Sequence, residues 1–250
     1  MLIQLTLDKL QKLHLNGMAR ALEQQQIDPN IHSLAFEDRI GLIVDAEEAS
    51  RATKKLKSRL QSAKPRTQAC LENLARVSAR GLDKGTLAVL ATSVWIEQGR
   101  NILISGPTGV GKTYLNCALI TSACRNGHSA LYTRSQRLLQ DLTIARADGS
   151  YRRLLTKLAR VEVLVIDDFG LFCMPDDNSR DLLEVIDDRS PAKPTIISSQ
   201  LPLENWHQTI SNPTIADAIL DRVVHNSYKL ILKGGSIRKG TISDTELEES

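Results

Sequence analysis

The spacing of hydrophobic residues changes near Gly99. Before that point, apolar side chains recur at intervals of three and four residues, which is typical of amphipathic helices. Beyond it, short apolar runs alternate with longer segments of helical periodicity. Such alternation predicts a parallel sheet with helices on both faces. We therefore expect a helical amino-terminal part followed by an α/β part.

The region before Gly99 is predicted to be almost wholly helical. The leucine-rich start of the chain predicts one amphipathic helix, and Asp28-Pro29-Asn30 marks a turn after it. A second helix is expected to begin near Ser33 or Phe36 and to continue to Lys64-Pro65. The predicted domain boundaries are 1–66 for a helical domain, 67–98 for a connector with a lead-in helix, 99–240 for the α/β domain and 241–250 for an acidic, disordered tail.

Five apolar runs in the second part predict the strands of the sheet. Two helical segments, at 135–147 and 151–160, lie between the second and third of these runs. The predicted strands are 101–105, 129–133, 162–167, 195–199 and 229–232.

The run at 101–105 leads into the pattern G-x-x-x-x-G-K-[ST], which a helix-like segment follows. Glycines let the backbone bend closely around phosphate oxygens, and the amides at a helix N-terminus favour an anion. Lys112 is expected to reach the β- and γ-phosphates of ATP, and the Thr113 hydroxyl to ligate Mg²⁺. The alternative is a glycine-rich turn with an incidental lysine. The predicted nucleotide-binding residues are Gly106, Pro107, Thr108, Gly109, Val110, Gly111, Lys112, Thr113 and Tyr114.

The third apolar run ends in two carboxylates, Asp167 and Asp168. In a parallel sheet of this kind, that end lies beside the phosphate-binding loop. Asp167 is expected to hold magnesium, and Asp168 to orient the attacking water. An aspartate that only caps the following turn is the alternative for either residue.

Basic residues gather between Glu48 and Glu72, where no acidic residue occurs. Their spacing is compatible with a helix that runs along a phosphate backbone, so we predict salt-sensitive contact with double-stranded DNA. A solvated helix face is the alternative. The predicted DNA-binding residues are Arg51, Lys54, Lys55, Lys57, Arg59 and Lys64, with Arg134 and Arg137 from the later arginine-rich segment.

Composition excludes several classes of protein. The content of hydrophobic residues is 42% and the formal net charge only +3, as expected of a globular chain. No apolar run reaches the roughly 20 residues of a membrane span, and the start lacks the apolar core of a signal peptide, so a cytoplasmic location is expected. The cysteines and histidines lack the spacing of a zinc site, and the cysteines that of a disulfide framework.

Several further segments are specific enough to suggest a family. They are GPTGVGKTYLNCAL at 106–119, YTRSQRLLQDL at 132–142, LVIDDFGL at 164–171, TIISSQLPLENWH at 195–207, ADAILDRVVHNS at 216–227 and GGSIRK at 234–239. With these segments the chain resembles IstB-type transposition helpers, which are AAA+ ATPases related to DnaC-type helicase loaders. The resemblance covers nearly the whole length.

The resemblance implies roles for three further residues. Gln200 matches the polar side chain that senses the γ-phosphate, and Arg222 matches the arginine that completes a neighbouring subunit's site. Arg238 matches an arginine of a reduced carboxy-terminal lid that senses nucleotide in cis. The implied protein is an ATP-assembled homo-oligomer with the ATP site at the subunit interface, which binds DNA and assists a cognate transposase.

The chain departs from the family pattern at the lid and at Asp168. Gly235 and Ile237 stand where Glu and Met are usual, and Asp168 stands where many AAA+ enzymes have Glu. The shorter side chain of Asp168 is expected to make hydrolysis slow without DNA or a partner.

Two other functions remain open at this point. A DnaC-like helicase loader would use the same ATP chemistry with a different partner. A P-loop kinase of small molecules is the less favoured alternative, because it leaves the basic helical start unexplained.

Overall fold

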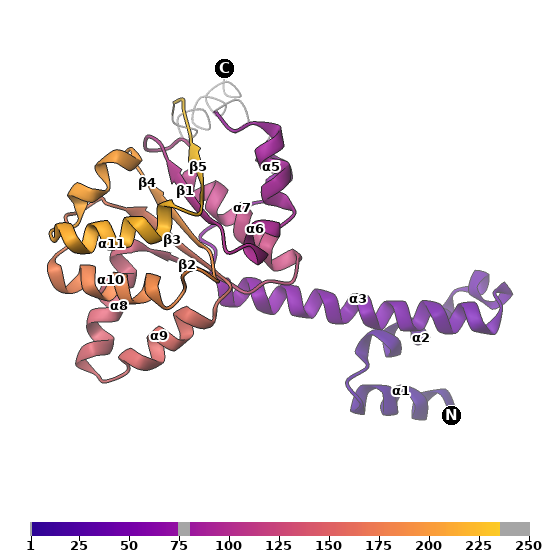
Figure 1. The fold of residues 1–250 in the computed structure, drawn as a ribbon. Coiled ribbons are helices and arrows are strands. Elements are labelled where there is room, and N and C mark those ends of the chain that lie inside the picture. The colour runs from indigo at the N-terminus through magenta and orange to yellow at the C-terminus, as the bar shows by residue number, and fades with distance from the viewer. Residues whose placement is uncertain (1, 75–80, 236–250) are drawn as a thin grey trace, which may run out of the picture. The chain divides into compact units, whose positions relative to one another are not determined.

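A computed structural model describes residues 2–74 and 81–235 of the chain (Figure 1). Contacts between Cα atoms divide the chain into two units, 1–58 and 59–250, each of which is described separately below. The division falls inside the long helix α3 (Phe36–Ala63), whereas the predicted domain boundary lies at residue 66. Residues 59–63 fall with the larger unit, where Ala63 is fully buried.

The smaller unit consists of helices. These are α1 (Leu2–Lys12), α2 (Asn16–Ile27), a 3₁₀ turn η1 (Pro29–Ser33) and the first part of α3. The leucine-rich start therefore forms two helices, because the chain breaks at Leu13–Leu15, where His14 has a left-handed φ of 58°. The turn at Asp28 and the helix beginning at Phe36 lie where they were expected.

Glu47 of α3 joins α2 to α3. Its carboxylate accepts hydrogen bonds from the backbone amides of Gly17 (2.7 Å) and Met18 (3.1 Å), and it pairs with Arg51 at 2.7 Å. The hydrogen bond from Arg51 and those two amides hold the pKa of Glu47 below its usual value. The side chain thus satisfies free amides at the start of α2, as an N-cap does.

The larger unit contains a parallel sheet in the order β2-β3-β4-β1-β5. Its strands are β1 (Asn101–Ser105), β2 (Ala130–Arg134), β3 (Val163–Phe169), β4 (Thr195–Ser199) and β5 (Ser227–Ile231). The predicted α/β fold with a five-stranded parallel sheet is confirmed. The fifth strand begins two residues before its predicted start. Ser227 and Tyr228 are only partly buried and lie outside the apolar run from which the strand was predicted.

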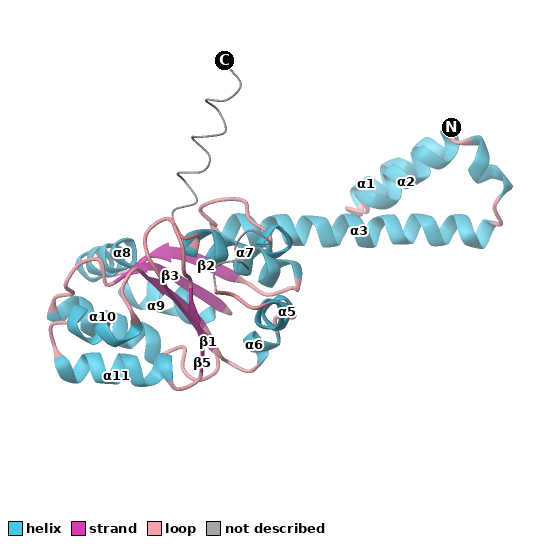
Figure 2. Ribbon diagram, turned by 90° about the horizontal axis from the view of Figure 1, so that it is seen from above, coloured by secondary structure: helices cyan, strands magenta, loops and turns pink. Residues whose placement is uncertain are grey.

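Helices cover both faces of this sheet (Figure 2). On one face, α7 packs on β2, β3 and β4, and α5 packs on α7. On the other face, α8 packs on the sheet beside α9 and α10, and α11 packs on α10. The helix bounds are α5 (Lys84–Ala91), α6 (Val94–Glu97), α7 (Lys112–Arg125), α8 (Ser135–Ala147), α9 (Tyr151–Arg160), α10 (Asp176–Asp187) and α11 (Pro213–Val224), with 3₁₀ turns η2 (Leu71–Leu74), η3 (Leu203–Asn205) and η4 (His207–Thr209). α8 and α9 have the predicted bounds. Among the described residues, no helix combines the length and apolarity needed to span a bilayer.

Arg189 is a buried polar anchor at the amino-terminal edge of the sheet. Its guanidinium donates to the carbonyls of Leu158, Val161, Glu162 and Pro194, and burial lowers its pKa to about 10. These bonds tie the end of α9 to the starts of β3 and β4. Arg189 therefore has a structural role at the edge opposite the phosphate-binding loop.

Gly17→Ala is expected to destabilise the smaller unit, because the added Cβ would lie 2.6 Å from the carbonyl oxygen of Ala46 and the Cα of Glu47. We expect a loss of about 1–3 kcal/mol in the free energy of unfolding, measured by hydrogen exchange of the α2 amides. The control is Gly41→Ala in α3, where no atom lies within 4 Å of the new Cβ and a gain of up to about 1 kcal/mol is expected. Equal protection of α2 in both variants would contradict this packing.

Candidate nucleotide-binding site

The loop between β1 and α7 is a backbone cradle at the carboxyl edge of the sheet. Gly106, Gly109 and Gly111 all have positive φ angles, of 152°, 81° and 109°. At Gly106 a Cβ would also lie 2.4 Å from the carbonyl oxygen of Leu232, so only glycine fits there. α7 begins at Lys112, directly after the loop, and its free amides therefore face the cradle.

Lys112 is folded into this loop. Its Nζ donates to the carbonyl oxygens of Gly106 (2.6 Å) and Pro107 (2.9 Å), and the residue is only 6% exposed. Burial lowers its pKa, while the charges of Asp167 and Asp168 act in the opposite direction. An ammonium group held this way lies at the centre of the cradle.

Asp167 is completely buried at the carboxyl end of β3 and accepts hydrogen bonds from three hydroxyl groups. Thr113 Oγ1 and Tyr132 Oη each donate to Oδ2 at 2.7 Å, and Ser198 Oγ donates to Oδ1. Asn116 of α7 in turn donates to Ser198 Oγ at 2.8 Å. The carboxylate therefore joins α7, β2 and β4 to β3.

Asp168 differs from its neighbour in both backbone and surroundings. Its φ is 59°, and the pairing of β3 with β4 shifts register between Ile166 and Phe169. This turn directs the Asp168 side chain into the cavity beside the loop, where Arg134 Nε lies 3.7 Å from Oδ2. Burial and the charge of Asp167 raise the pKa of Asp168, and Arg134 opposes this rise.

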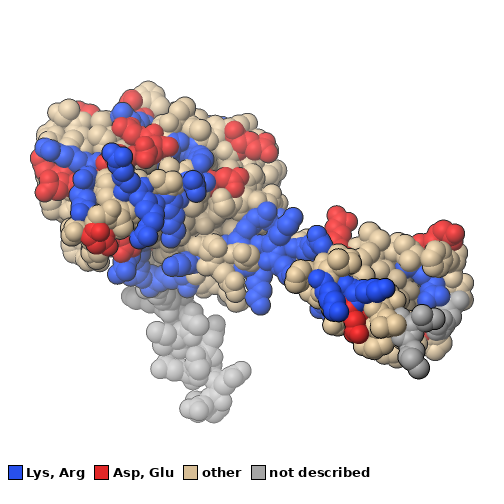
Figure 3. All heavy atoms as spheres, turned by 90° about the horizontal axis from the view of Figure 1, so that it is seen from below, with Lys and Arg blue, Asp and Glu red and all other residues tan. Residues whose placement is uncertain are grey.

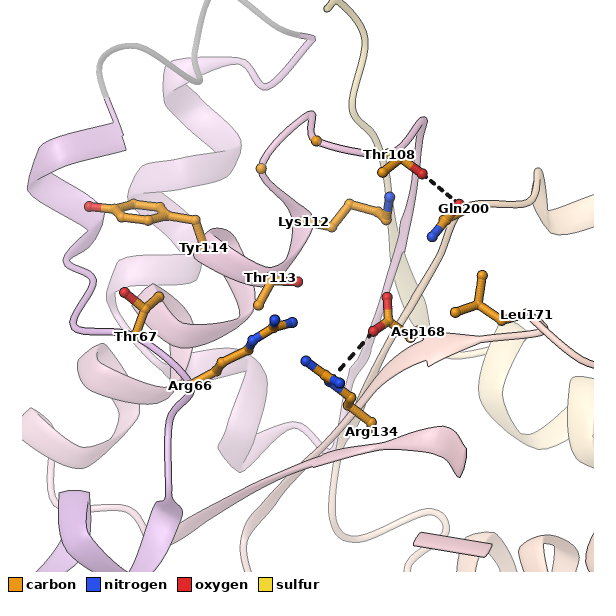
Figure 4. A pocket seen from close by; sticks show the side chains of 12 residues that line it. Arg66, Thr67, Thr108, Lys112, Thr113, Tyr114, Arg134, Asp168, Leu171 and Gln200 are labelled. Carbon is orange, nitrogen blue, oxygen red and sulfur yellow. Dashed lines mark hydrogen bonds and ion pairs between the residues drawn. The ribbon is translucent and has the colours of Figure 1, made fainter. Parts of the chain in front are cut away.

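Gln200 follows the last residue of β4, as the sequence predicted. Its Oε1 accepts a hydrogen bond of 2.6 Å from Thr108 Oγ1 in the cradle (Figure 4). Tyr114, from the first turn of α7, also lines this region.

A cavity of about 500 Å³ opens between these groups. It brings together the loop, Asp168 and Gln200 (Figure 4). Three of its lining residues, Arg66, Thr67 and Leu171, were absent from the predicted site. Arg66 belongs to the basic segment between Glu48 and Glu72, and Thr67 belongs to no motif. Both follow α3 in sequence and reach the loop only through folding.

Tyr132, Ser198 and Asn116 were also missed by sequence reasoning. Each is a polar residue within a strand or helix whose neighbours are mostly apolar. A polar residue in such a segment is the signal that could have predicted a buried hydrogen bond. Burial, followed by the hydrogen bond to Asp167, raises the pKa of Tyr132, so the phenol remains a donor at neutral pH.

Arg222 lies at the opposite edge of the sheet. Its backbone oxygen accepts a hydrogen bond of 3.2 Å from the Asn101 side chain at the start of β1, and its guanidinium pairs with Asp187. Since the loop follows the other end of β1, Arg222 does not line the cavity of its own chain. Arg238, assigned to the lid by resemblance, lies outside the described residues.

The predicted DNA-binding residues fall in both units and differ in their partners. Lys54, Lys55 and Lys57 are exposed on α3 in the smaller unit. In the larger unit Lys64 is exposed, and Arg134 and Arg137 pair with Asp168 and Asp141. Arg51 pairs with Glu47, and Arg59 is half-buried. Figure 3 shows a cluster of Lys and Arg side chains on the viewed face of the larger unit.

Comparison with known proteins identifies the family. The model of the IstB-like ATP-binding proteins matches residues 8–245. The chain belongs to this family. A protein of insertion sequence IS1162 from Pseudomonas fluorescens, whose name describes it as ATP-binding, is 51% identical over 81% of this chain and 88% of its own length. An insertion-sequence ATP-binding protein of Sinorhizobium fredii is 44% identical over 96% of this chain and 98% of its own length.

Solved structures resemble this IstB-like protein in fold. DnaI has a TM-score of 0.57 at 19% identity and covers 66% of this chain and 92% of its own. The replication initiator DnaA, in a structure with AMPPCP and single-stranded DNA, has a TM-score of 0.56 at 17% identity and covers 72% of this chain and 54% of its own. These similarities show that the chain shares the α/β fold of these replication proteins.

Tyr132→Phe is expected to lower the free energy of unfolding of this IstB-like protein by about 1–2 kcal/mol, because buried Asp167 loses one hydroxyl donor. Urea denaturation measures the loss. Tyr114→Phe is the control, since the Tyr114 hydroxyl makes no hydrogen bond with the residues that the structure describes. Equal midpoints for the two variants would show that the bond to Asp167 contributes nothing.

Proposed function

We propose that this protein is an ATP-dependent, DNA-binding helper of a transposase. The observation that carries the proposal is the hydrogen bond between Thr113 and buried Asp167, beside the glycine-rich cradle and Lys112. Membership of the IstB-like family supports it, as do relatives that are named as ATP-binding proteins of insertion sequences. The helper selects target DNA or activates the transposase, and another protein performs strand cleavage.

The residues of the cradle fit ATP with magnesium. Positive φ angles and the start of α7 direct amides to one point, which suits phosphate oxygens. Thr113 Oγ1 and Asp167 Oδ2, 2.7 Å apart, are hard oxygen ligands of the kind that Mg²⁺ prefers. Within the described ranges, no cluster of three His, Cys, Asp or Glu could hold a metal alone. Mg²⁺ is commonly held by one or two protein carboxylates together with phosphates and water.

In the proposed reaction each group beside the cradle has a separate task. Thr113 and Asp167 would hold Mg²⁺, which would supply positive charge against the charge that develops on the phosphate oxygens. Lys112 moves from the loop carbonyls to the phosphates, and Gln200 contacts the γ-phosphate. Asp168 orients the attacking water and accepts its proton, which its position in the cavity permits.

Assembly completes the site in this proposal. Arg222 cannot serve the cavity of its own chain, so it contacts the γ-phosphate bound to a neighbouring subunit after leaving Asp187. Its guanidinium stabilises charge on the transferred phosphoryl group, and hydrolysis therefore depends on oligomerisation. Arg238 of the reduced lid contacts nucleotide in cis.

DNA binding follows from the same assembly. Subunits held together by ATP present many copies of the helical region 1–66 to one duplex, so weak contacts from α3 add together. Hydrolysis removes the γ-phosphate contacts and loosens the assembly. The protein acts in the cytoplasm, where ATP and genomic DNA are both available.

The deciding experiment is light scattering with duplex DNA in the presence of ATP-Mg²⁺, ADP-Mg²⁺ or no nucleotide. A large assembly that requires ATP and DNA supports the helper. A monomer that is indifferent to both contradicts it. Co-purification of the ATP-bound assembly with the transposase of the same insertion sequence, and not with a replicative helicase, separates the helper from a helicase loader.

Lys112→Ala is expected to weaken ATP binding by at least roughly tenfold and to abolish ATP-dependent assembly, because the cradle loses its charge. Asp168→Asn keeps ATP binding but slows hydrolysis by roughly a hundredfold, since an amide cannot accept the proton. Equilibrium binding and phosphate release measure the two effects. Normal turnover by both variants at saturating ATP and DNA would refute the site.

Charge reversal of Lys54, Lys55 and Lys57 to Glu is expected to weaken duplex binding and to reduce its dependence on salt. These side chains are exposed, so the fold and ATP affinity stay unchanged. Anisotropy of labelled duplex over a salt series tests this. The control is the same charge change at Lys9, Lys12 and Lys84, which lie outside the predicted DNA-binding residues. Equal loss in both variants would make the effect one of net charge alone.

A further inference from the structure

Arg66 lines the nucleotide cavity although it lies far in sequence from the phosphate-binding loop and from Asp168. It belongs to the segment that follows α3, where Lys64 has a left-handed φ of 51° and Pro65 interrupts the helix. Its side chain extends into the cavity toward Thr113 and Arg134 (Figure 4). Arg66 therefore lies beside the groups proposed to hold the end of the triphosphate.

The segment that contains Arg66 lies against α7. Burial raises the pKa of Cys117 in α7, and the backbone of Thr67 and Arg66 acts in the opposite direction. Ala63 and Ala69, on either side, are buried. The backbone of Arg66 is thus anchored, while its guanidinium remains exposed to the cavity.

The charges around the cavity are not balanced by protein groups. Arg66, Arg134 and Lys112 all act on the charge of Asp168, and Arg134 is the one of them that pairs with it, at 3.7 Å. Asp167 is buried and already engaged by hydroxyl donors. No carboxylate among the described residues pairs with Arg66. Converging cations favour an anion between them, and a guanidinium forks onto phosphate oxygens.

We propose that Arg66 binds the γ-phosphate of ATP in its own subunit. The inference rests on the proposed function, in which the same cavity holds ATP. The γ-phosphate is the part addressed, because Arg66 lies beside Thr113 and Asp168, at the Mg²⁺ and hydrolysis end of the site. ADP lacks this contact.

The contact links the DNA-binding helix to the nucleotide. Lys64 and Arg66 flank Pro65, and Arg59 of the last turns of α3 belongs to the same unit. Duplex bound by Arg59 and Lys64 restrains the segment that positions Arg66. By linkage, ATP then strengthens DNA binding by the same factor as DNA strengthens ATP binding.

The test compares Arg66→Ala with wild type in binding to a non-hydrolysable ATP analogue and to ADP, with Mg²⁺ and without DNA. Affinity for the analogue falls on the order of tenfold to a hundredfold, as for loss of a charge-assisted hydrogen bond, while affinity for ADP stays within about threefold. Arg66→Lys restores part of the loss, because it keeps the charge without the fork. Arg160→Ala, an exposed arginine of α9, is the control and leaves both affinities unchanged.

A second arm measures duplex affinity in each nucleotide state. Wild type binds duplex more tightly with the analogue than with ADP, and Arg66→Ala loses this difference but keeps its affinity in ADP. An unchanged ratio of analogue to ADP affinity in Arg66→Ala overturns the inference. So does a variant that loses duplex affinity equally in every state, since Arg66 is then a DNA contact.

The two proposals fail in distinguishable ways. If wild type binds the analogue and Lys112→Ala does not, the nucleotide site stands, and the Arg66 variant decides the inference alone. If wild type binds neither nucleotide, the proposed function is wrong and the role of Arg66 with it. Retained ADP affinity in Arg66→Ala shows that the variant is folded.

Discussion

The buried carboxylate of Asp167 is the group on which the arrangement of the site depends. A charge removed from water is costly unless hydrogen bonds replace its hydration. Here Thr113, Tyr132 and Ser198 provide them from α7, β2 and β4. The same hydrogen bonds that stabilise the charge therefore bring α7 and the ends of β2, β3 and β4 together.

That requirement gives the two adjacent aspartates different properties. Asp167 is enclosed and fully hydrogen-bonded, whereas Asp168 turns through a left-handed backbone into the cavity. The Asp167 side chain is held in a fixed position, which suits a metal ligand. The Asp168 side chain is accessible to water and to cationic side chains from several elements, which suits a proton acceptor. The distinction arises from the register shift at the end of β3.

The two edges of the sheet also have separate properties. The carboxyl edge carries the cradle, the cavity and Gln200, and it gathers Lys112, Arg66 and Arg134. The amino edge carries Arg222 with Asp187, and the buried anchor Arg189. Under the proposed function, a nucleotide cavity at one edge and Arg222 at the other suit head-to-tail assembly, in which each edge meets the opposite edge of a neighbour.

The sequence by itself determined the class of fold, the strands, the bounds of α8 and α9 and the phosphate-binding loop. Each of these depends on local pattern: apolar runs, helical periodicity, and glycines followed by Lys112 and Thr113. Only the tertiary structure decided that Tyr132, Ser198 and Asn116 surround Asp167, and that Arg66 enters the cavity. It also separated α1 from α2 at His14. The physical reason is that hydrogen bonding to a buried charge, and the convergence of cations, depend on distances between elements far apart in the chain, which no local periodicity encodes.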